Sequence, residues 1–302
     1  ENLKQLPRIC FTPEKPSNVK RWIVFGDSFT DGYFLQNTWV DEMNELYLKD
    51  SISIELYSFS VNGGGIRNWN QIFQKLIQTK FEYDGVIFAV FGNDLKRDFF
   101  VLHQDKEQEL YKYYDHIPSQ SEVDLDLKNS IKTQQNFTQL FKGEFIYTSK
   151  ICNYILRTYL TNKFNTVNND SQRVLQNEFI ISNDPTDINL EFLENKYLEK
   201  FQIFNKLIDT IKSEKKEIIL LSIPELNGLK MNEEGSQTQI QKELKLMANE
   251  YQLDFIDGYQ LLINSEVKSL DSLYFKNDGH WNQIGSDEFA LQLYKKYHSL
   301  LN

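Results

Sequence analysis

The chain has 302 residues, of which 40% are hydrophobic and 25% charged, with only 13 glycines and 6 prolines. This balance is typical of a globular protein and excludes a collagen-like, low-complexity or wholly disordered chain. The net charge of −10 argues against general binding to nucleic acid or to an anionic membrane surface. No apolar stretch of the sequence approaches the roughly 18 residues that a transmembrane helix needs.

The N-terminal region and the cysteines add little to the fold prediction. Residues 1–20 carry three prolines and are expected to form an extended lead-in to one domain that spans residues 21–302. Because the chain starts at Glu1 rather than Met, we expect that a preceding segment has been removed. Cys10 and Cys152 lack metal-ligand spacing, and two free thiols are favoured over one disulfide between them.

Five short apolar runs are typical of strands buried in a parallel sheet. They cover residues 22–25, 52–61, 86–91, 218–223 and 253–256. Between or after them, apolar residues recur at helical spacing over residues 69–77, 193–211 and 289–297. Alternation of strands and helices indicates βαβ units, so the sequence predicts an α/β fold with a parallel five-stranded sheet covered on both faces.

One segment interrupts this alternation. Residues 95–189 show no clear strand, and their composition is polar and rich in tyrosine. Solvated or irregular structure is expected over residues 105–114, 121–135 and 162–177. Such a length is too long for a βα loop. We therefore predict an insertion, or a lid, that emerges beside the carboxyl ends of the strands.

Chemistry-bearing residues follow several of the predicted strands. Ser28 follows the first strand in the triplet Gly26-Asp27-Ser28, and three glycines at positions 63–65 follow the second. Asn93 follows the third, and Asp278 and His280 come near the end of the chain. Ligands of open α/β sheets bind beyond the carboxyl ends of the strands, so we expect these groups to meet there.

Each group alone has an ordinary structural explanation, since Gly-Asp-Ser is common in turns and glycine runs are common in loops. Their conjunction is more specific. A nucleophile, main-chain and side-chain N–H donors, an imidazole and a carboxylate are the parts that acyl transfer requires. The sequence therefore predicts a site for acyl transfer with a serine nucleophile.

These blocks resemble the SGNH superfamily of GDSL-type hydrolases over residues 21–94 and 217–300. The resemblance implies a three-layer α/β/α fold of flavodoxin-like type, with Ser28 as nucleophile and His280 as base. It also implies an oxyanion hole made by the main-chain N–H groups of Ser28 and Gly65 and the side chain of Asn93, with Gly64 as the alternative to Gly65. It implies no metal and no cofactor.

The acid of this predicted triad departs from the commonest family spacing, which places an aspartate three residues before the histidine. Position 277 is Asn, and Asp278 lies two residues before His280. A subset of the superfamily similar to glycan O-acetylation proteins has this Asp-x-His-Trp spacing, and Trp281 fits it. We therefore predict Asp278 as the acid; the alternative is that Asp278 only caps the last helix.

Three functions agree with this pattern. The first is a serine esterase that cleaves a small acyl or acetyl ester of a carbohydrate or lipid through an acyl-enzyme. The second is an O-acyltransferase that moves an acetyl group onto a glycan, and the third is a non-catalytic binding module. The expected partner is a small-molecule or glycan ester, with no nucleic acid and no transmembrane segment. Glycan O-acyl chemistry favours a place outside the cytoplasm, and the sequence predicts no oligomeric state.

Overall fold

The computed structural model describes residues 13–32, 35–97, 99–105, 108–114, 190–276 and 278–301. Both cysteines, residues 1–12 of the predicted lead-in and most of the predicted insertion lie outside these residues. In chain order the elements are β1 (Lys20–Phe25), α1 (Ser28–Asp31), α2 (Trp39–Lys49), β2 (Ile54–Ser58), α3 (Ile66–Gln78), β3 (Gly85–Val90), β4 (Phe99–Asp105), β5 (Gln108–Tyr114), α8 (Leu190–Ser213), β6 (Glu217–Ser222), α9 (Leu226–Glu233), α10 (Gln239–Tyr251), β7 (Asp254–Ile256), α11 (Gly258–Ile263), the 3-10 helix η1 (Leu270–Leu273) and α12 (Gln283–Leu301).

The central sheet has five strands in the order β2-β1-β3-β6-β7, and every neighbouring pair is parallel. The polarity and order of these strands are those of a flavodoxin-like sheet. The strands lie within one or two residues of the predicted runs, apart from β2, whose predicted run extends further at its carboxyl end. The predicted α/β fold is confirmed.

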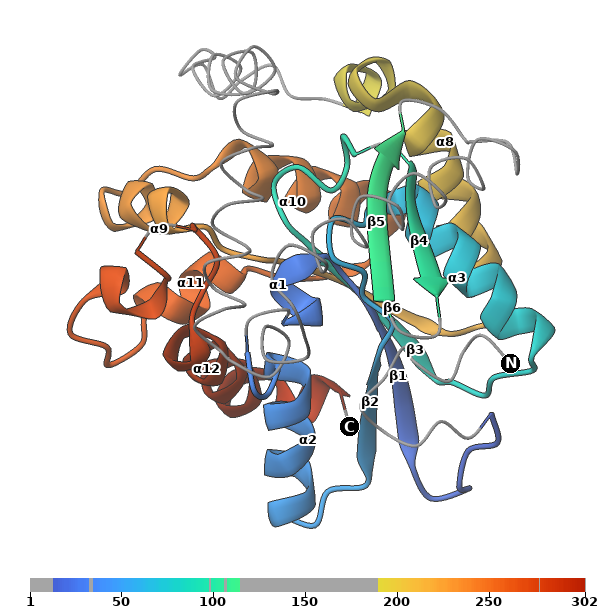
Figure 1. Ribbon diagram of the computed structural model, residues 1–302, viewed down its shortest axis with the longest axis horizontal. Coiled ribbons are helices and arrows are strands. Elements are labelled where there is room, and N and C mark those ends of the chain that lie inside the picture. The colour runs from blue at the N-terminus through green and yellow to red at the C-terminus, as the bar shows by residue number, and fades with distance from the viewer. Residues whose placement is uncertain are drawn as a thin grey trace, which may run out of the picture. The chain divides into compact units, whose positions relative to one another are not determined.

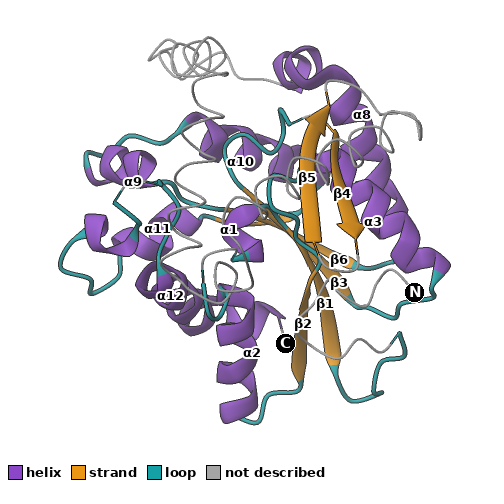
Figure 2. Cartoon of the chain, viewed as in Figure 1, coloured by secondary structure: helices purple, strands orange, loops and turns teal. Residues whose placement is uncertain are grey.

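Helices cover both faces of this sheet (Figures 1 and 2). On one side α8 packs against α3, α10 and β6, and on the other α12 packs against α2 and α11. The three layers bury β1 and β3 completely apart from the first residue of β1, since the apolar runs of these strands face helices on both sides. The predicted three-layer arrangement is therefore also confirmed.

Strands β4 and β5 form a separate two-stranded sheet. The prediction of no strand in this part of the chain, and of irregular structure over residues 105–114, is wrong at these positions. The buried strands were recognised by continuous apolar runs, which a two-stranded sheet does not require. The phenylalanines and tyrosines of these two segments favour a pleated strand instead.

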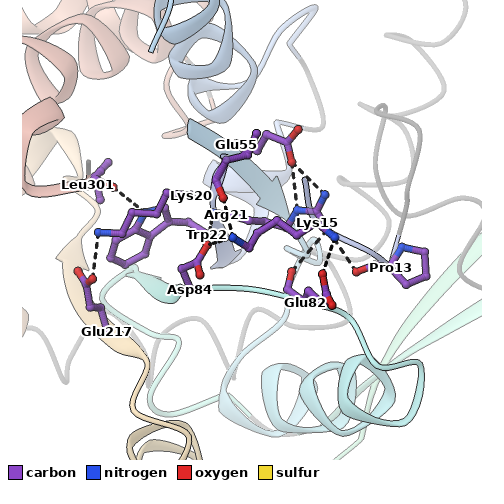
Figure 3. A network of polar contacts seen from close by, with 11 residues as sticks. Pro13, Lys15, Lys20, Arg21, Trp22, Glu55, Glu82, Asp84, Glu217 and Leu301 are labelled. Atoms are coloured by element: carbon purple, nitrogen blue, oxygen red, sulfur yellow. Dashed lines mark hydrogen bonds and ion pairs between the residues drawn. The ribbon is translucent and has the colours of Figure 1, made fainter. Parts of the chain in front are cut away.

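A polar network ties the amino ends of the strands together (Figure 3). Arg21 is fully buried, its Nε donates to Glu55 Oε2 over 3.0 Å, and its main-chain N–H donates to Asp84 Oδ2 over 2.8 Å. Its guanidinium also lies over the rings of Tyr57 and Phe81, at 4.7 and 5.1 Å from their centroids. These contacts join β1, β2 and the segment before β3. They lie at the amino ends of the strands, whereas the predicted site lies at the carboxyl ends.

Candidate active site

Ser28 is placed by the turn that connects β1 to α1. Asp27 caps this short helix, with its Oδ1 accepting from the N–H of Phe29 over 2.9 Å. A Cβ at position 26 would lie 2.4 Å from Thr30 Oγ1, so only glycine fits this tight turn. Ser28 therefore begins α1 directly at the carboxyl end of β1, and 7% of its surface remains exposed.

The structure brings Ser28, His280 and Asp278 into one chain of hydrogen bonds. Ser28 Oγ lies 2.7 Å from His280 Nε2, and His280 Nδ1 is bonded to Asp278 Oδ1. With Nδ1 donating to the carboxylate, Nε2 is left to accept the hydroxyl proton of Ser28. The hydrogen bond from His280 holds the pKa of Asp278 below the usual range, so this carboxylate stays ionised at neutral pH.

A tight turn sets the spacing of the acid and the base. Gly279 lies between them with a φ of +82°, a conformation that favours glycine. The N–H of Phe275 donates to the carbonyl of His280 over 2.8 Å and closes the turn. Asn282, rather than Asp278, caps α12, because its Oδ1 accepts from the N–H of Gly285 over 3.1 Å. Asn277 lies outside the described residues.

Aromatic side chains fix the plane of the imidazole. The ring of Phe29 stacks on His280 with centroids 4.7 Å apart, and Phe91 stacks on Phe29 at 4.4 Å. The indole of Trp281 donates to the carbonyl of Phe29 over 3.1 Å. The sequence motifs included Trp281 but missed Phe29 and Phe91, whose only signal is that each directly follows or precedes a motif residue.

The glycine loop after β2 offers a main-chain donor at Gly65 rather than at Gly64. The N–H of Gly64 already donates to the carbonyl of Val61 over 2.8 Å. The N–H groups of Gly65 and Ser28 have no acceptor among the described residues. A Cβ at position 65 would lie 2.6 Å from the carbonyl oxygen of Asp94, so the glycine loop and the loop after β3 are in direct contact.

Asn93 lies half-buried in that next loop. Its Oδ1 is buried and has no hydrogen-bond partner within the described residues, and its amide nitrogen makes no bond there either. The loop itself is well anchored, since Asp94 Oδ2 accepts from the N–H of Phe91 over 2.8 Å. An anchored loop that presents an unbonded amide is suited to offer an N–H to a ligand.

Two buried carboxyl groups and one arginine lie beneath these loops. Asp27 and Asp94 are both fully buried. Arg97 Nη1 lies 3.5 Å from Asp27 Oδ2 and 3.8 Å from Asp94 Oδ1, and it donates to the carbonyl of Gly64 over 3.3 Å. Burial, together with the nearby charge of Asp27, raises the pKa of Asp94 well above the usual range. The sequence motifs did not single out Arg97, which falls in the segment predicted as an insertion.

The described residues also include a cavity at the opposite end of the sheet. The cavity, of about 480 Å³, lies at the amino ends of the strands, and two of the lysines that line it, Lys15 and Lys20, are already paired with Asp84 and Glu217. Within the described residues no group of three His, Cys, Asp or Glu side chains is placed to hold a metal ion. No described helix combines the length and apolar character required to cross a membrane.

No family model matches the chain, and no curated protein is similar to it in sequence. Solved structures resemble it at low identity. An acetyl xylan esterase is 14% identical over 91% of this chain and 98% of that one, with a TM-score of 0.47. A catalytic mutant of an acetylxylan esterase from Geobacillus stearothermophilus is 12% identical over 94% and 96%, with a TM-score of 0.49. An esterase from Pseudoalteromonas sp. is 11% identical over 94% and 99%, with a TM-score of 0.45.

Proposed function

We propose that the chain is a serine esterase of the SGNH type, with Ser28 as nucleophile, His280 as general base and Asp278 as the acid that orients it. One observation carries this proposal: the unbroken hydrogen-bonded series from Ser28 Oγ through both ring nitrogens of His280 to Asp278. A nucleophile, its base and an orienting anion in this order form the arrangement that activates a hydroxyl for acyl transfer.

In the first half of the proposed reaction the ester is cleaved. His280 Nε2 takes the proton of Ser28 Oγ as this oxygen forms a bond to the ester carbonyl carbon. The carbonyl oxygen becomes an oxyanion that accepts from the N–H groups of Ser28 and Gly65 and from the amide of Asn93. When the C–O bond to the alcohol breaks, the departing oxygen takes the proton from His280, and the acyl group remains on Ser28.

In the second half the acyl-enzyme is released. His280 takes a proton from water, the resulting hydroxide attacks the acyl carbon, and the proton returns to Ser28 Oγ when the ester bond to the serine breaks. Asp278 remains ionised throughout and stabilises the imidazolium that forms twice per cycle. The lowered pKa of Asp278 supports this role, since it reflects the hydrogen bond between the two side chains.

Small acyl esters are the first substrates to test. A chromogenic acetate ester should be hydrolysed by the wild-type chain, and Ser28→Ala should abolish turnover. Ser60→Ala is the matched control, because Ser60 is also a buried serine near the carboxyl end of a strand, but its hydroxyl is paired with Ser58. A phosphonate should label Ser28. Labelling of another residue, or full activity of Ser28→Ala, would contradict the proposal.

The products of the same reaction identify the acceptor of the acyl group. Product analysis with and without an added glycan separates hydrolysis from acyl transfer, since both use the same Ser28-bound intermediate. Acetate as the main product supports an esterase. An acetylated glycan as the main product would replace the esterase with the O-acyltransferase. A chain that binds esters but neither hydrolyses nor transfers them would be a binding module.

A further inference from the structure

We propose that Arg97 is a positioning residue that aims the main-chain N–H of Gly65 at the oxyanion, through its hydrogen bond to the carbonyl of Gly64. This inference rests on the proposed function and extends it to a residue that touches no reacting atom. It is carried by the contacts of one buried guanidinium with the two loops that would bind the oxyanion.

The geometry of the peptide bond links the two groups. The carbonyl of Gly64 and the N–H of Gly65 belong to one planar trans peptide, in which they point in opposite directions. A donor that fixes the carbonyl therefore fixes the direction of the N–H. Arg97 Nη1 donates to this carbonyl over 3.3 Å, while the N–H at the other end of the peptide has no acceptor among the described residues.

The peptide between Gly64 and Gly65 has more conformational freedom than one between other residues, so its orientation depends on hydrogen bonds from neighbouring groups. Gly64 and Gly65 have no side chains, and glycine backbones populate more conformations than any other residue. Gly65 is the N-cap of α3 but has no side chain to form a capping bond. Without the bond from Arg97 the plane of this peptide would be held less firmly, and its N–H would occupy the productive direction for a smaller fraction of the time.

Arg97 is itself held by the loop that carries the second oxyanion donor. Its main-chain N–H donates to the carbonyl of Asn93 over 3.1 Å. A Cβ added to Gly65 would lie only 3.1 Å from the Cβ of Arg97, so the stem of the arginine packs directly against the glycine loop. One residue thus connects the loop of Asn93 with the peptide of Gly65 and sets their spacing.

The charge around Arg97 explains why the guanidinium remains in place. Only 15% of its side chain is exposed, and two fully buried carboxyl groups lie within 4 Å of Nη1, at 3.5 Å for Asp27 and 3.8 Å for Asp94. Asp27 also caps the helix that begins with Ser28. The arginine is therefore anchored from the nucleophile side and from the Asn93 side, while its Nη1 also donates to the carbonyl of Gly64.

The test measures how strongly the enzyme depends on the oxyanion hole. An acetate ester is compared with its thionoester, in which sulfur replaces the carbonyl oxygen. Sulfur accepts hydrogen bonds poorly, so an aligned N–H favours the oxygen substrate more than a misaligned one does. In Arg97→Gln we expect kcat for the oxygen ester to fall about 10-fold or more, with KM little changed. The preference for oxygen ester over thionoester should fall with it.

A second arginine provides the matched control. Arg67 is similarly buried and lies two residues from Gly65, but its guanidinium pairs with Glu199 at 2.7 Å. Arg67→Gln should keep the wild-type preference between the two esters. A loss of folded enzyme lowers both rates equally and leaves their ratio unchanged, so the ratio separates positioning from stability.

Arg97→Lys guards against a misfolded Arg97→Gln protein. The ammonium is a point charge that the two carboxyl groups attract more strongly than a neutral carbonyl does, so the fold should be kept and the Gly64 carbonyl released. A lowered ratio in this variant supports the proposal. A wild-type ratio in every folded variant of Arg97 overturns it, while Ser28-dependent turnover leaves the esterase proposal standing.

Discussion

Trp281 donates its indole N–H to the main-chain carbonyl of Phe29 over 3.1 Å. These two residues directly follow the proposed base and the proposed nucleophile, so one hydrogen bond joins segments that lie 252 positions apart in the chain. Phe29 also stacks on His280 at 4.7 Å between ring centroids. The position of the imidazole relative to Ser28 is therefore set by the neighbours of both residues as well as by their own bond.

Removing the hydrogen bond between Trp281 and Phe29 should lower activity, even when an aromatic side chain still fills the position of Trp281 in the core. Trp281→Phe keeps an aromatic ring but leaves the Phe29 carbonyl without its donor. We expect kcat to fall about 10-fold, because small misplacements of a catalytic group are costly. Trp39→Phe is the control: Trp39 is equally buried and also packs against Phe289, but its indole bonds to Thr30. Equal kcat in the two variants would show that the bond to Phe29 does not position the base.

The charge of Asp278 should matter more than its shape. Asp278→Asn keeps the size of the side chain but removes the anion that holds Nδ1–H and stabilises the imidazolium. We expect kcat to fall by about 10²- to 10⁴-fold, with phosphonate labelling of Ser28 correspondingly slow. Asp271→Asn serves as the control, since Asp271 is an exposed carboxylate paired with Lys230. A nearly unchanged kcat in Asp278→Asn would leave a Ser28–His280 dyad.

The buried strands could be predicted from the sequence because burial on both faces requires apolar residues at successive positions. Strands β3 and β6 show this pattern. Helix α2 was not predicted, although Thr38 and Asp41 form a capping box at its start. Its buried residues Trp39, Val40, Met43 and Tyr47 also recur at helical spacing, so its sequence does carry the pattern of a helix with one buried face.

Residues whose side chains can bear the chemistry could be proposed from the sequence, while a residue whose proposed role runs through the backbone could not. Ser28 and His280 could be proposed because serine and histidine can serve as nucleophile and base, and the structure brings their side chains within 2.7 Å of each other. Arg97 contacts a main-chain carbonyl, and neither partner of such a bond is marked in the sequence. The choice between Gly64 and Gly65 also needed coordinates, because the two residues differ only in where their N–H groups point.

The close approach of two loops makes position 65 intolerant of any side chain. A Cβ in Gly65→Ala would lie 2.6 Å from the carbonyl oxygen of Asp94, so the loops must move apart. We expect kcat to fall about 10²-fold, as for the loss of one oxyanion donor. Gly92→Ala is the control within the same site, because a Cβ there meets no atom within 4 Å. Similar kcat values for both variants would remove Gly65 from the proposed oxyanion hole.

The pKa of Asp94 predicts how stability depends on pH. Burial and the nearby Asp27 raise the pKa of the folded state, whereas the unfolded carboxyl titrates near about 3.9. Between these two values the folded chain keeps a proton that the unfolded chain has released. The contribution of Asp94 to the free energy of unfolding is therefore fully present below about pH 4, and it is lost as the pH rises through the folded pKa.

Asp94→Asn should remove this loss, since an amide does not titrate and its oxygen can still accept from the Phe91 N–H. Urea unfolding from about pH 4 to pH 8 should show the variant gaining stability relative to wild type as the pH rises.

The variant Asp84→Asn should change the pH dependence of stability in the opposite direction. Although burial raises the pKa of Asp84, the Arg21 N–H and Lys15 lower it below the usual value. That carboxylate stabilises the fold above about pH 4, so its loss should cost more at neutral pH than in acid. Parallel pH profiles for wild type and Asp94→Asn would mean that Asp94 is ionised beside Asp27, with Arg97 balancing both charges.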